Sequence, residues 1–427
     1  MAEAIAGQEG PQSQGHGVGT APVFLASVST ILGALMFLRF GYAVGHTGLV
    51  GALLIILLGH MVTVPTALAI AEIATNRRVE GGGEYFIISR SFGTTIGGAI
   101  GISLYMSQAI SVAFYMIAFA EAVRPLAPLF EARTGIAFDP RMVSLPATVI
   151  LVSVVLRKGA DLGVKALWVV ASILGLSLAM FFLGAGPDEI RPESVSVFSD
   201  LADPDPFMLV FAIVFPAFTG MTAGVGLSGD LAQPRRSIPL GIMSATFAGM
   251  VIYILVVVKL ASTVNAQALA ADYLIMQRIA LWGPIIPIGL ACATISSAIG
   301  SILVAPRTLQ ALGADEVVPR PRLNRFVAAG VGEANEPRNA TLVTSAVAIV
   351  FVFLGNVDVV ARIVSMFFMV TYGALCAISF LEHFAARPSY RPSFRSKWYL
   401  SLTGAVMCFV LMLQMDPLFA AAVSYTH

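Results

Sequence analysis

The chain contains few charged residues. Only 11% of its 427 residues are Asp, Glu, Lys or Arg, whereas 57% are hydrophobic and the mean hydropathy is +0.86. Soluble globular proteins carry roughly 25% charged residues, most of them on the surface. A water-exposed globular protein of this length is therefore excluded, and the composition indicates a chain that lies largely within a lipid bilayer.

The chain also lacks the residue clusters that enzymes and metal sites require. Its three cysteines, Cys292, Cys376 and Cys408, fall inside apolar stretches, where we interpret them as small packing residues. Residues 81–83 are three glycines, but no phosphate-loop Lys-Ser/Thr pair follows them. No nucleophile–base pair and no basic stretch with interleaved aromatic residues stands in the sequence. We therefore expect no enzymatic activity, no cofactor and no nucleic-acid partner.

Long apolar stretches are abundant instead. A membrane-spanning helix needs about 20 apolar residues. Suitable stretches lie at roughly 21–44, 48–75, 94–122, 143–157, 162–184, 207–227, 239–263, 283–304, 341–355, 360–383 and 398–415. A further one begins after Pro417. We expect an all-α integral membrane protein with about 11 complete spans and a C-terminally truncated twelfth.

The positive charges predict how the chain is oriented. Arg and Lys gather in alternate loops, as at residues 77–78, 157–158, 235–236 and 387–397. Cytoplasmic loops are enriched in these residues, so we expect a cytoplasmic N-terminus in a multi-pass protein of the inner (plasma) membrane. Residues 1–20 have neither Lys, Arg nor an apolar core, which predicts a disordered tail before a transporter domain at 21–427.

Two of the apolar stretches are interrupted at mid-depth. Residues 28–38 read VSTILGALMFL, and residues 214–227 read VFPAFTGMTAGVGL. A helix broken inside lipid leaves backbone groups unpaired unless protein or a cavity satisfies them. Breaks at corresponding places in two halves indicate the binding site of a secondary transporter. We expect inverted repeats at about 21–184 and 207–383, whose breaks at Thr30–Leu35 and Thr219–Thr222 meet near the midplane.

The chemistry of the breaks suits ions of both signs. Each break exposes helix C-terminal carbonyls, which attract cations, and helix N-terminal amides, which attract anions. No charged side chain stands at either break. A lone ion there would be an uncompensated charge in a low dielectric. This argues for transport of opposite charges together, or of a zwitterion.

Several strings of residues resemble one family. They are IATN (73–76), GGGEYFIISRSFG (81–93), GGAIG (97–101), FPAFTGMTAGVGLSGDLAQPRRSIPLG (215–241), ATISSAIGSILVAPRTLQAL (293–312), SMFFMVTYGA (365–374) and RPSYRPSF (387–394). In this order the chain resembles a prokaryotic member of the cation–chloride cotransporters, Na-K-Cl cotransporter-like, in the amino acid–polyamine–organocation (APC) superfamily. The resemblance implies the LeuT-type fold with a 5+5 inverted repeat and broken helices 1 and 6.

The resemblance also implies where Na+, K+ and Cl− bind as transported ions. The potassium site would use Thr30, Ile31, Tyr115, Pro216 and Thr219, although the family usually has Asn at the position of Thr30. The sodium site would use Ser29, Leu32, Ala293, Ser296 and Ser297. The two chloride positions would use backbone amides and one hydroxyl, from Gly33, Ala34, Leu35, Gly220, Met221, Thr222 and Tyr372.

Arg39 and Glu121 are expected to pair as an outer gate above the ions, since a charge at that depth needs a partner. The function implied is electroneutral symport of Na+ and/or K+ with Cl− by alternating access, in a homodimer. Two alternatives stay open. One is an amino-acid permease of the same superfamily, disfavoured because bulky Leu35 and Met36 follow the first break. The other is a non-transporting membrane scaffold.

Overall fold

The computed structural model describes residues 19–76, 84–158, 164–231, 233–332, 335–385, 390–417 and 420. Most of the tail expected at 1–20, the three glycines at 81–83 and most of the expected twelfth span lie outside these residues. The described residues are almost entirely helical, with one isolated bridge between Val331 and Glu336 and no strand. This confirms the expected all-α fold class.

Each of the eleven complete spans expected from the sequence coincides with a helical segment among the described residues. The α-helices are α1 (Thr20–Ile31), α2 (Ala34–Asn76), α3 (Glu84–Val123), α4 (Ala127–Thr134), α5 (Arg141–Lys158), α6 (Val164–Leu183), α7 (Phe207–Val214), α8 (Pro234–Thr263), α9 (Ala266–Ala271), α10 (Ile275–Ile279), α11 (Ile285–Ala314), α12 (Pro321–Ala328), α13 (Arg338–Leu354), α14 (Val357–Ala385) and α15 (Trp398–Met415). Three 3₁₀ helices accompany them, η1 (Arg124–Leu126), η2 (Asp188–Ile190) and η3 (Phe215–Asp230).

Within the described part of the chain, eight helical runs are long and apolar enough to cross a membrane. One of them, Thr20–Asn76, contains two of the expected spans. The chain reverses between these two spans at Gly48, whose φ of 68° favours glycine. A side chain there would also collide with the backbone of Phe198, since an added Cβ would lie 2.5 Å from its Cα. The run α3 turns similarly at Gly93 (φ 82°), so its spanning part begins there.

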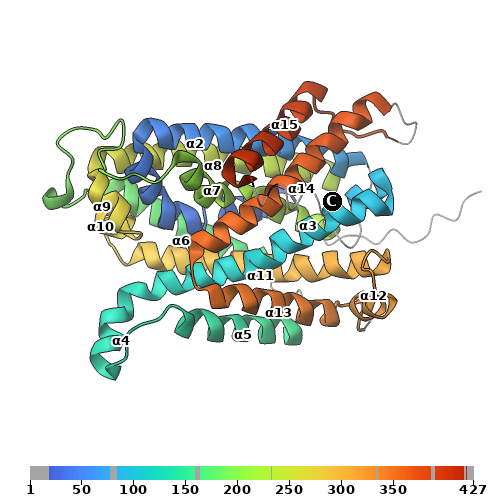
Figure 1. Cartoon of the computed structure of the whole chain (residues 1–427), viewed down its shortest axis with the longest axis horizontal. Helices are drawn as coiled ribbons and strands as arrows, with labels where there is room; N and C mark the ends of the chain where they lie inside the picture. Colours follow the sequence, from blue (N-terminus) through green and yellow to red (C-terminus); the bar gives the residue numbers. More distant parts are fainter. Residues whose placement is uncertain are drawn as a thin grey trace, which may run out of the picture.

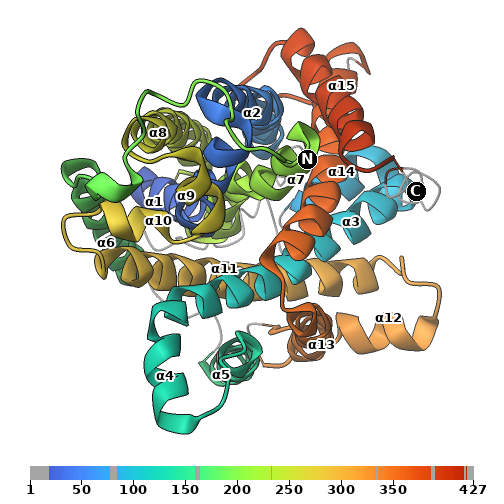
Figure 2. The same ribbon diagram turned by 60° about the vertical axis from the view of Figure 1, so that its left-hand side comes forward.

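The helices form two packed groups (Figures 1 and 2). In the first group, α1 is enclosed by α8 and η3, and α2 runs along α8. In the second group, α3 lies along α11, with α5 and α13 packed against both. Helix α14 contacts α3 and α2 and joins the two groups, and α15 packs on its other side. The two expected repeats therefore each begin with a broken segment, α1–α2 and α7–η3.

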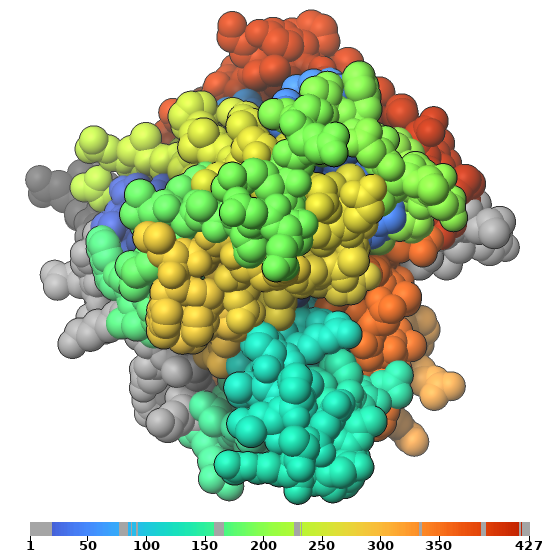
Figure 3. All heavy atoms as spheres, turned by 90° about the vertical axis from the view of Figure 1, so that its left-hand side faces the viewer, coloured from blue at the N-terminus to red at the C-terminus, as the bar shows by residue number. Residues whose placement is uncertain are grey.

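The two ends of the bundle differ in how they are covered. We call the end that carries α4, α9 and α10 the outer end, and the end that carries α12 the inner end; both names follow the expected topology. Figure 3 looks onto the outer end, where the segment between α6 and α7 and the α9–α10 segment lie over the helices. The backbone of Leu49 bonds Ser196 (2.9 Å), which ties this cover to α2.

Candidate binding site at the helix breaks

The first break falls where the sequence predicts it. Helix α1 ends at Ile31, Leu32 and Gly33 are not helical, and α2 begins at Ala34. The Gly33 amide donates to Thr30 O (3.3 Å) instead of to its α-helical acceptor, Ser29 O. The carbonyl of Ser29 thereby loses its helical donor, which is the condition under which a backbone oxygen becomes available to a cation.

The second break extends further than expected. The α-helix stops at Val214, and the chain continues as the 3₁₀ helix η3 from Phe215 to Asp230. Pro216 explains the change, because it has no amide hydrogen to continue the α-helical pattern. Runs of 3₁₀ helix this long are uncommon and are often found at functional hinges. The expected interruption at Thr219–Thr222 is thus one part of a longer rewound segment.

The two breaks touch each other. A Cβ built on Gly220 would lie 2.5 Å from the Ile31 backbone nitrogen and 2.9 Å from the Thr30 Cβ. Glycine is therefore required at this position for η3 to approach α1. Ser27 Oγ also donates to Met221 O (3.2 Å). The expectation that the breaks meet is confirmed.

Tyr253 of α8 binds both broken segments and was not identified from the sequence. Its side chain is fully buried, and its hydroxyl hydrogen-bonds to Ile31 O and to Ala217 O, the latter at 2.9 Å. These two carbonyls belong to α1 and η3. The only sequence signal was a tyrosine inside an otherwise aliphatic span, and such a tyrosine is equally common as a packing residue.

A cavity of about 60 Å³ lies beside the breaks. Three predicted potassium-site side chains, Thr30, Tyr115 and Thr219, line it together. Its other lining residues come from α3, η3, α11 and α14 and are Gln108, Ser111, Gly220, Thr222, Ala223, Ser297, Gly300, Ser301, Val304 and Phe368. One water needs about 10–15 Å³ on this measure, so the cavity has room for a few waters or ions. None of these lining residues is charged.

The cavity hydroxyls are arranged to present oxygen. Thr30 Oγ1 donates to Ala26 O (3.0 Å), and Thr219 Oγ1 donates to Pro216 O (2.8 Å). A hydroxyl has one donor hydrogen and two acceptor lone pairs. Because both hydrogens already point at carbonyls, the lone pairs of both threonines are left for a positively charged ligand.

The predicted sodium residues include two buried hydroxyls without a hydrogen-bond partner among the described residues, Ser29 Oγ and Ser297 Oγ. Ser297 is 5% exposed and also faces the Tyr115 hydroxyl. Ser296 is half-buried, whereas Leu32 and Ala293, whose carbonyls were expected to contribute, are buried. A buried oxygen without a partner costs about 1–3 kcal/mol, and a bound cation removes that cost.

The two predicted chloride positions differ. Ala34 and Leu35 are in the first turn of α2, where backbone amides have no acceptor within the helix. Among the described residues, these two amides also have no backbone acceptor outside it. The Gly33 amide, in contrast, already donates to Thr30 O. Gly220, Met221 and Thr222 lie inside η3, where 3₁₀ bonds engage their amides, and the Tyr372 hydroxyl donates to Thr219 O (2.7 Å). The second position is therefore not open to an anion in this conformation.

The expected pair of Arg39 with Glu121 is wrong for this structure. Arg39, which is 2% exposed, pairs through Nε with Asp358 Oδ1 at 2.5 Å, and its guanidinium stacks 3.8 Å from the ring centre of Tyr273. Glu121 pairs with Arg124 one turn away, at 3.2 Å. The sequence indicated that Arg39 needs a partner, but Asp358 stands 319 residues further along the chain.

These features define the class of protein. A multi-pass helical membrane protein whose first and sixth spans are broken beside a shared polar cavity is a solute transporter. The chain belongs to the amino acid permease family, whose model matches residues 23–426.

Curated relatives agree with this family. The chain is 32% identical to solute carrier family 12 member 1 of Mus musculus, over 94% of its own length and 41% of that protein. It is 32% identical to solute carrier family 12 member 2 of Squalus acanthias over 90% of its length, and 29% identical to member 9 of Danio rerio over 94%. The chain spans 36% and 49% of the lengths of the last two. The resemblance predicted from the motifs is confirmed.

Proposed function

We propose that the chain is a secondary active transporter that moves Na+ and/or K+ together with Cl− in an electroneutral symport. The observation that carries the proposal is the uncharged cavity at the meeting point of the two breaks, lined by Thr30, Tyr115 and Thr219. Neutral oxygens can replace the water shell of an alkali cation. They carry no net charge, however, so they do not neutralise the charge of the cation. An anion bound nearby would supply that balance.

A cation in the cavity would meet hydroxyl oxygens and backbone carbonyls. Thr30 and Thr219 would offer the lone pairs that their own hydrogen bonds leave free, and Tyr115 its phenolic oxygen. The carbonyls of Ile31 and Pro216 would complete the potassium site. A sodium ion would instead lie between α1 and α11, where Ser29 Oγ and Ser297 Oγ have no hydrogen bond of normal geometry to the described residues.

The anion would bind at the start of α2. There the Ala34 and Leu35 amides are free of outside acceptors, and the helix dipole adds roughly half a positive charge. This position is next to Thr30 in the chain, so cation and anion would neutralise each other at short range. A second chloride could bind Gly220–Thr222 only after η3 unwinds. We therefore assign this chloride to another conformation in the transport cycle.

The conformation corresponds to a transporter closed on its outer side. The Arg39–Asp358 pair and the stacked Tyr273 lie toward the outer end from the breaks. The cavity lining continues from Tyr115 to Gln108 on α3 and from Ser297 to Val304 on α11, both toward the inner end. With a cytoplasmic N-terminus in the plasma membrane, the cavity would be approached from the cytoplasm. A homodimer stays a prediction.

Uptake into proteoliposomes tests the proposal. Labelled rubidium or sodium uptake should require external chloride and should disappear when gluconate replaces it. Thr219→Val removes one cavity oxygen and should lower uptake at least ~10-fold, the loss expected for a ligand bond of about 1.4 kcal/mol. Thr246→Val is the matched control, since Thr246 is equally buried on α8 and bonds only its own helix. Amino-acid uptake independent of chloride would instead establish the permease alternative.

A further inference from the structure

Helix α12 runs across the inner ends of α11 and α13 rather than along them. Figure 1 views it almost end-on beyond these two helices, and Figure 2 shows its side at the same end. Its inward face is fixed by Asn324 and Val327, which are buried. Asn324 Nδ2 donates to Val318 O (2.7 Å), and Val327 packs so closely on Gly313 that an added Cβ would come within 2.5 Å of it.

The position of α12 coincides with the expected edge of the bilayer hydrocarbon. Helix α13 has 17 residues. At 1.5 Å per residue this is about 25 Å, slightly less than the ~30 Å hydrocarbon thickness. Its first residue, Arg338, is charged and exposed, so we expect this end of α13 at the interface. Asn339 in the first turn of α13 donates through Nδ2 to Phe326 O (2.9 Å). This bond holds α12 at the level where α13 enters the membrane.

The outward face of α12 combines basic and apolar side chains. With Asn324 and Val327 inward, a spacing of about 100° per residue places Arg322 and Phe326 on the opposite side, and Leu323 and Arg325 on its two flanks. Leu323 is 41% exposed and Phe326 is 45% exposed. Three exposed arginines stand beside them, Arg320, Arg322 and Arg325. Among the described residues none of these arginines is within ion-pair distance of a carboxylate.

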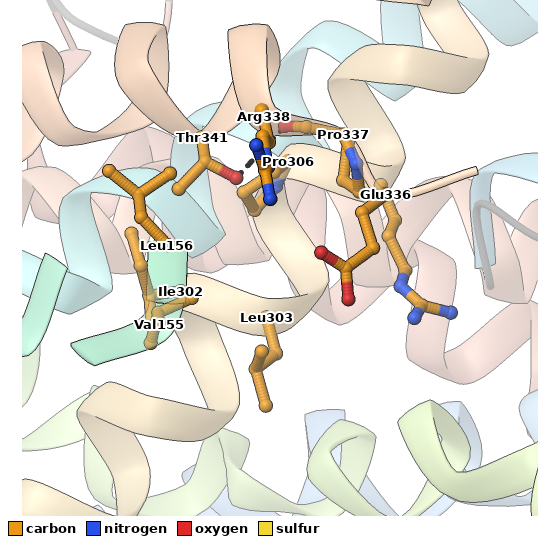
Figure 4. A pocket seen from close by; sticks show the side chains of 10 residues that line it. Val155, Leu156, Ile302, Leu303, Pro306, Glu336, Pro337, Arg338 and Thr341 are labelled. Carbon is orange, nitrogen blue, oxygen red and sulfur yellow. Dashed lines mark hydrogen bonds between the residues drawn. The ribbon is translucent and has the colours of Figure 1, made fainter. Parts of the chain in front are cut away.

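A pocket of about 40 Å³ lies between α5, α11 and α13 (Figure 4), and its lining residue Arg338 directly precedes Asn339, which bonds α12. Its wall is apolar, with Val155, Ile302 and Leu303 among the lining residues. Two more arginines, Arg307 and Arg338, border it, and both are exposed and unpaired among the described residues. Its single carboxylate is that of Glu336. Basic groups thus outnumber acidic ones at this corner of the molecule.

We propose that α12 and this adjoining pocket bind anionic phospholipids of the cytoplasmic leaflet. Phosphate groups would pair with the α12 arginines, Phe326 and Leu323 would enter the acyl boundary, and an acyl chain would lie against the apolar wall. An interfacial helix binds in this way, with basic side chains on its polar side toward the headgroups and aromatic or aliphatic side chains on its other side in the acyl boundary. Each arginine near an anionic surface should favour the anionic lipid by about fivefold. The inference is independent of which solute is carried.

Fluorescence of a Phe326→Trp variant tests the proposal in reconstituted vesicles. The difference from the parent protein isolates the new tryptophan from Trp168, Trp282 and Trp398. We expect brominated phosphatidylglycerol, at a minor fraction in unlabelled phosphatidylcholine, to quench it several-fold more than brominated phosphatidylcholine at the same fraction. Adding Arg320→Gln, Arg322→Gln and Arg325→Gln should remove that preference.

The control removes the same charge elsewhere. Arg235, Arg236 and Arg391 are also exposed and expected on the cytoplasmic side, and their change to Gln should leave the preference intact. Equal quenching by both lipids would show contact with the membrane through apolar groups alone and would overturn the proposal. Absence of quenching by either lipid would place the face in water or against a protein partner, and would also overturn it.

Discussion

At the scale of single residues, the site depends on groups whose hydrogen-bond state is defined by the backbone breaks. Tyr253 links the two breaks, because its hydroxyl hydrogen-bonds to a carbonyl of α1 and to a carbonyl of η3. Ser297 is the opposite case, a buried hydroxyl without a protein partner that meets normal geometry. The first kind of residue positions the site, and the second is available to a ligand.

Tyr253→Phe should therefore weaken cation binding without removing any predicted cation ligand. The Ile31 and Ala217 carbonyls lose the one hydroxyl hydrogen that they share, at roughly 1–3 kcal/mol, and the two breaks lose the side chain that links them. We expect the half-saturating rubidium or sodium concentration to rise about 5- to 100-fold in uptake assays. Tyr399→Phe, on the exposed part of α15, is the control and should behave as the parent. An unchanged half-saturating concentration in Tyr253→Phe would show that Tyr253 does not position the cation site.

Ser297→Ala separates a ligand role from a packing role. Because Ser297 Oγ is buried and makes no hydrogen bond of normal geometry with the described residues, its removal should leave the melting temperature in detergent unchanged or slightly raised. Sodium dependence should nevertheless weaken, with a half-saturating concentration about 10-fold higher. Ser345, also 5% exposed, bonds Thr341 O and serves as the control through Ser345→Ala. Equal sodium dependence in both variants would contradict the sodium assignment.

Glu84 gives a pH dependence of stability. It precedes the spanning part of α3, and burial raises its pKa to about 8 from an ordinary value of 4.5. Between these values the folded chain holds a proton that the unfolded chain releases, so stability falls as pH rises from about 4.5 to about 8. Thermal unfolding in detergent should show this fall, and Glu84→Gln should flatten it. Glu189→Gln, at an exposed position, should retain it. Parallel curves for the parent and Glu84→Gln would refute the assignment.

At the scale of helices and their breaks, much could be predicted from the sequence. The spans follow from apolar length, and the first break from Thr30 and Gly33 standing in mid-span. The length of η3 could not be predicted, because Pro216 indicates where an α-helix stops but not where the rewound segment ends. Partners distant in sequence were also missed. Tyr253 meets Ile31 across 222 positions and Arg39 meets Asp358 across 319, and neither distance leaves a local pattern.

The contact between α2 and α14 at the outer end makes a prediction about closure. Arg39 is nearly fully buried. Removing one partner of such an ion pair leaves the other charge buried and uncompensated, at a cost of about 3–5 kcal/mol. Arg39→Asp or Asp358→Arg alone should lower uptake at least ~10-fold. The double exchange should restore part of it, while the stacking on Tyr273 is lost. Glu121→Gln should have little effect. A double exchange no better than either single variant would exclude a gate at this pair.

At the scale of the whole molecule, two helix groups enclose a small uncharged cavity that is covered on the outer side (Figure 3). Under the proposed symport, alternating access would require the α1–α2–η3–α8 group to move against α3 and α11, which would open Arg39–Asp358 and close the inner path. Coupling arises if the cycle proceeds only when cation and anion are bound together, since either alone leaves an uncompensated charge.

Equilibrium binding to the purified protein tests this coupling most directly. Labelled rubidium or sodium should bind more tightly as chloride replaces gluconate, and labelled chloride should bind more tightly by the same factor as the cation is added, since linkage between two sites is reciprocal. We expect a factor of roughly 5–150, the usual range for coupled sites. Cation binding that is indifferent to chloride, together with displacement by an amino acid, would contradict the account.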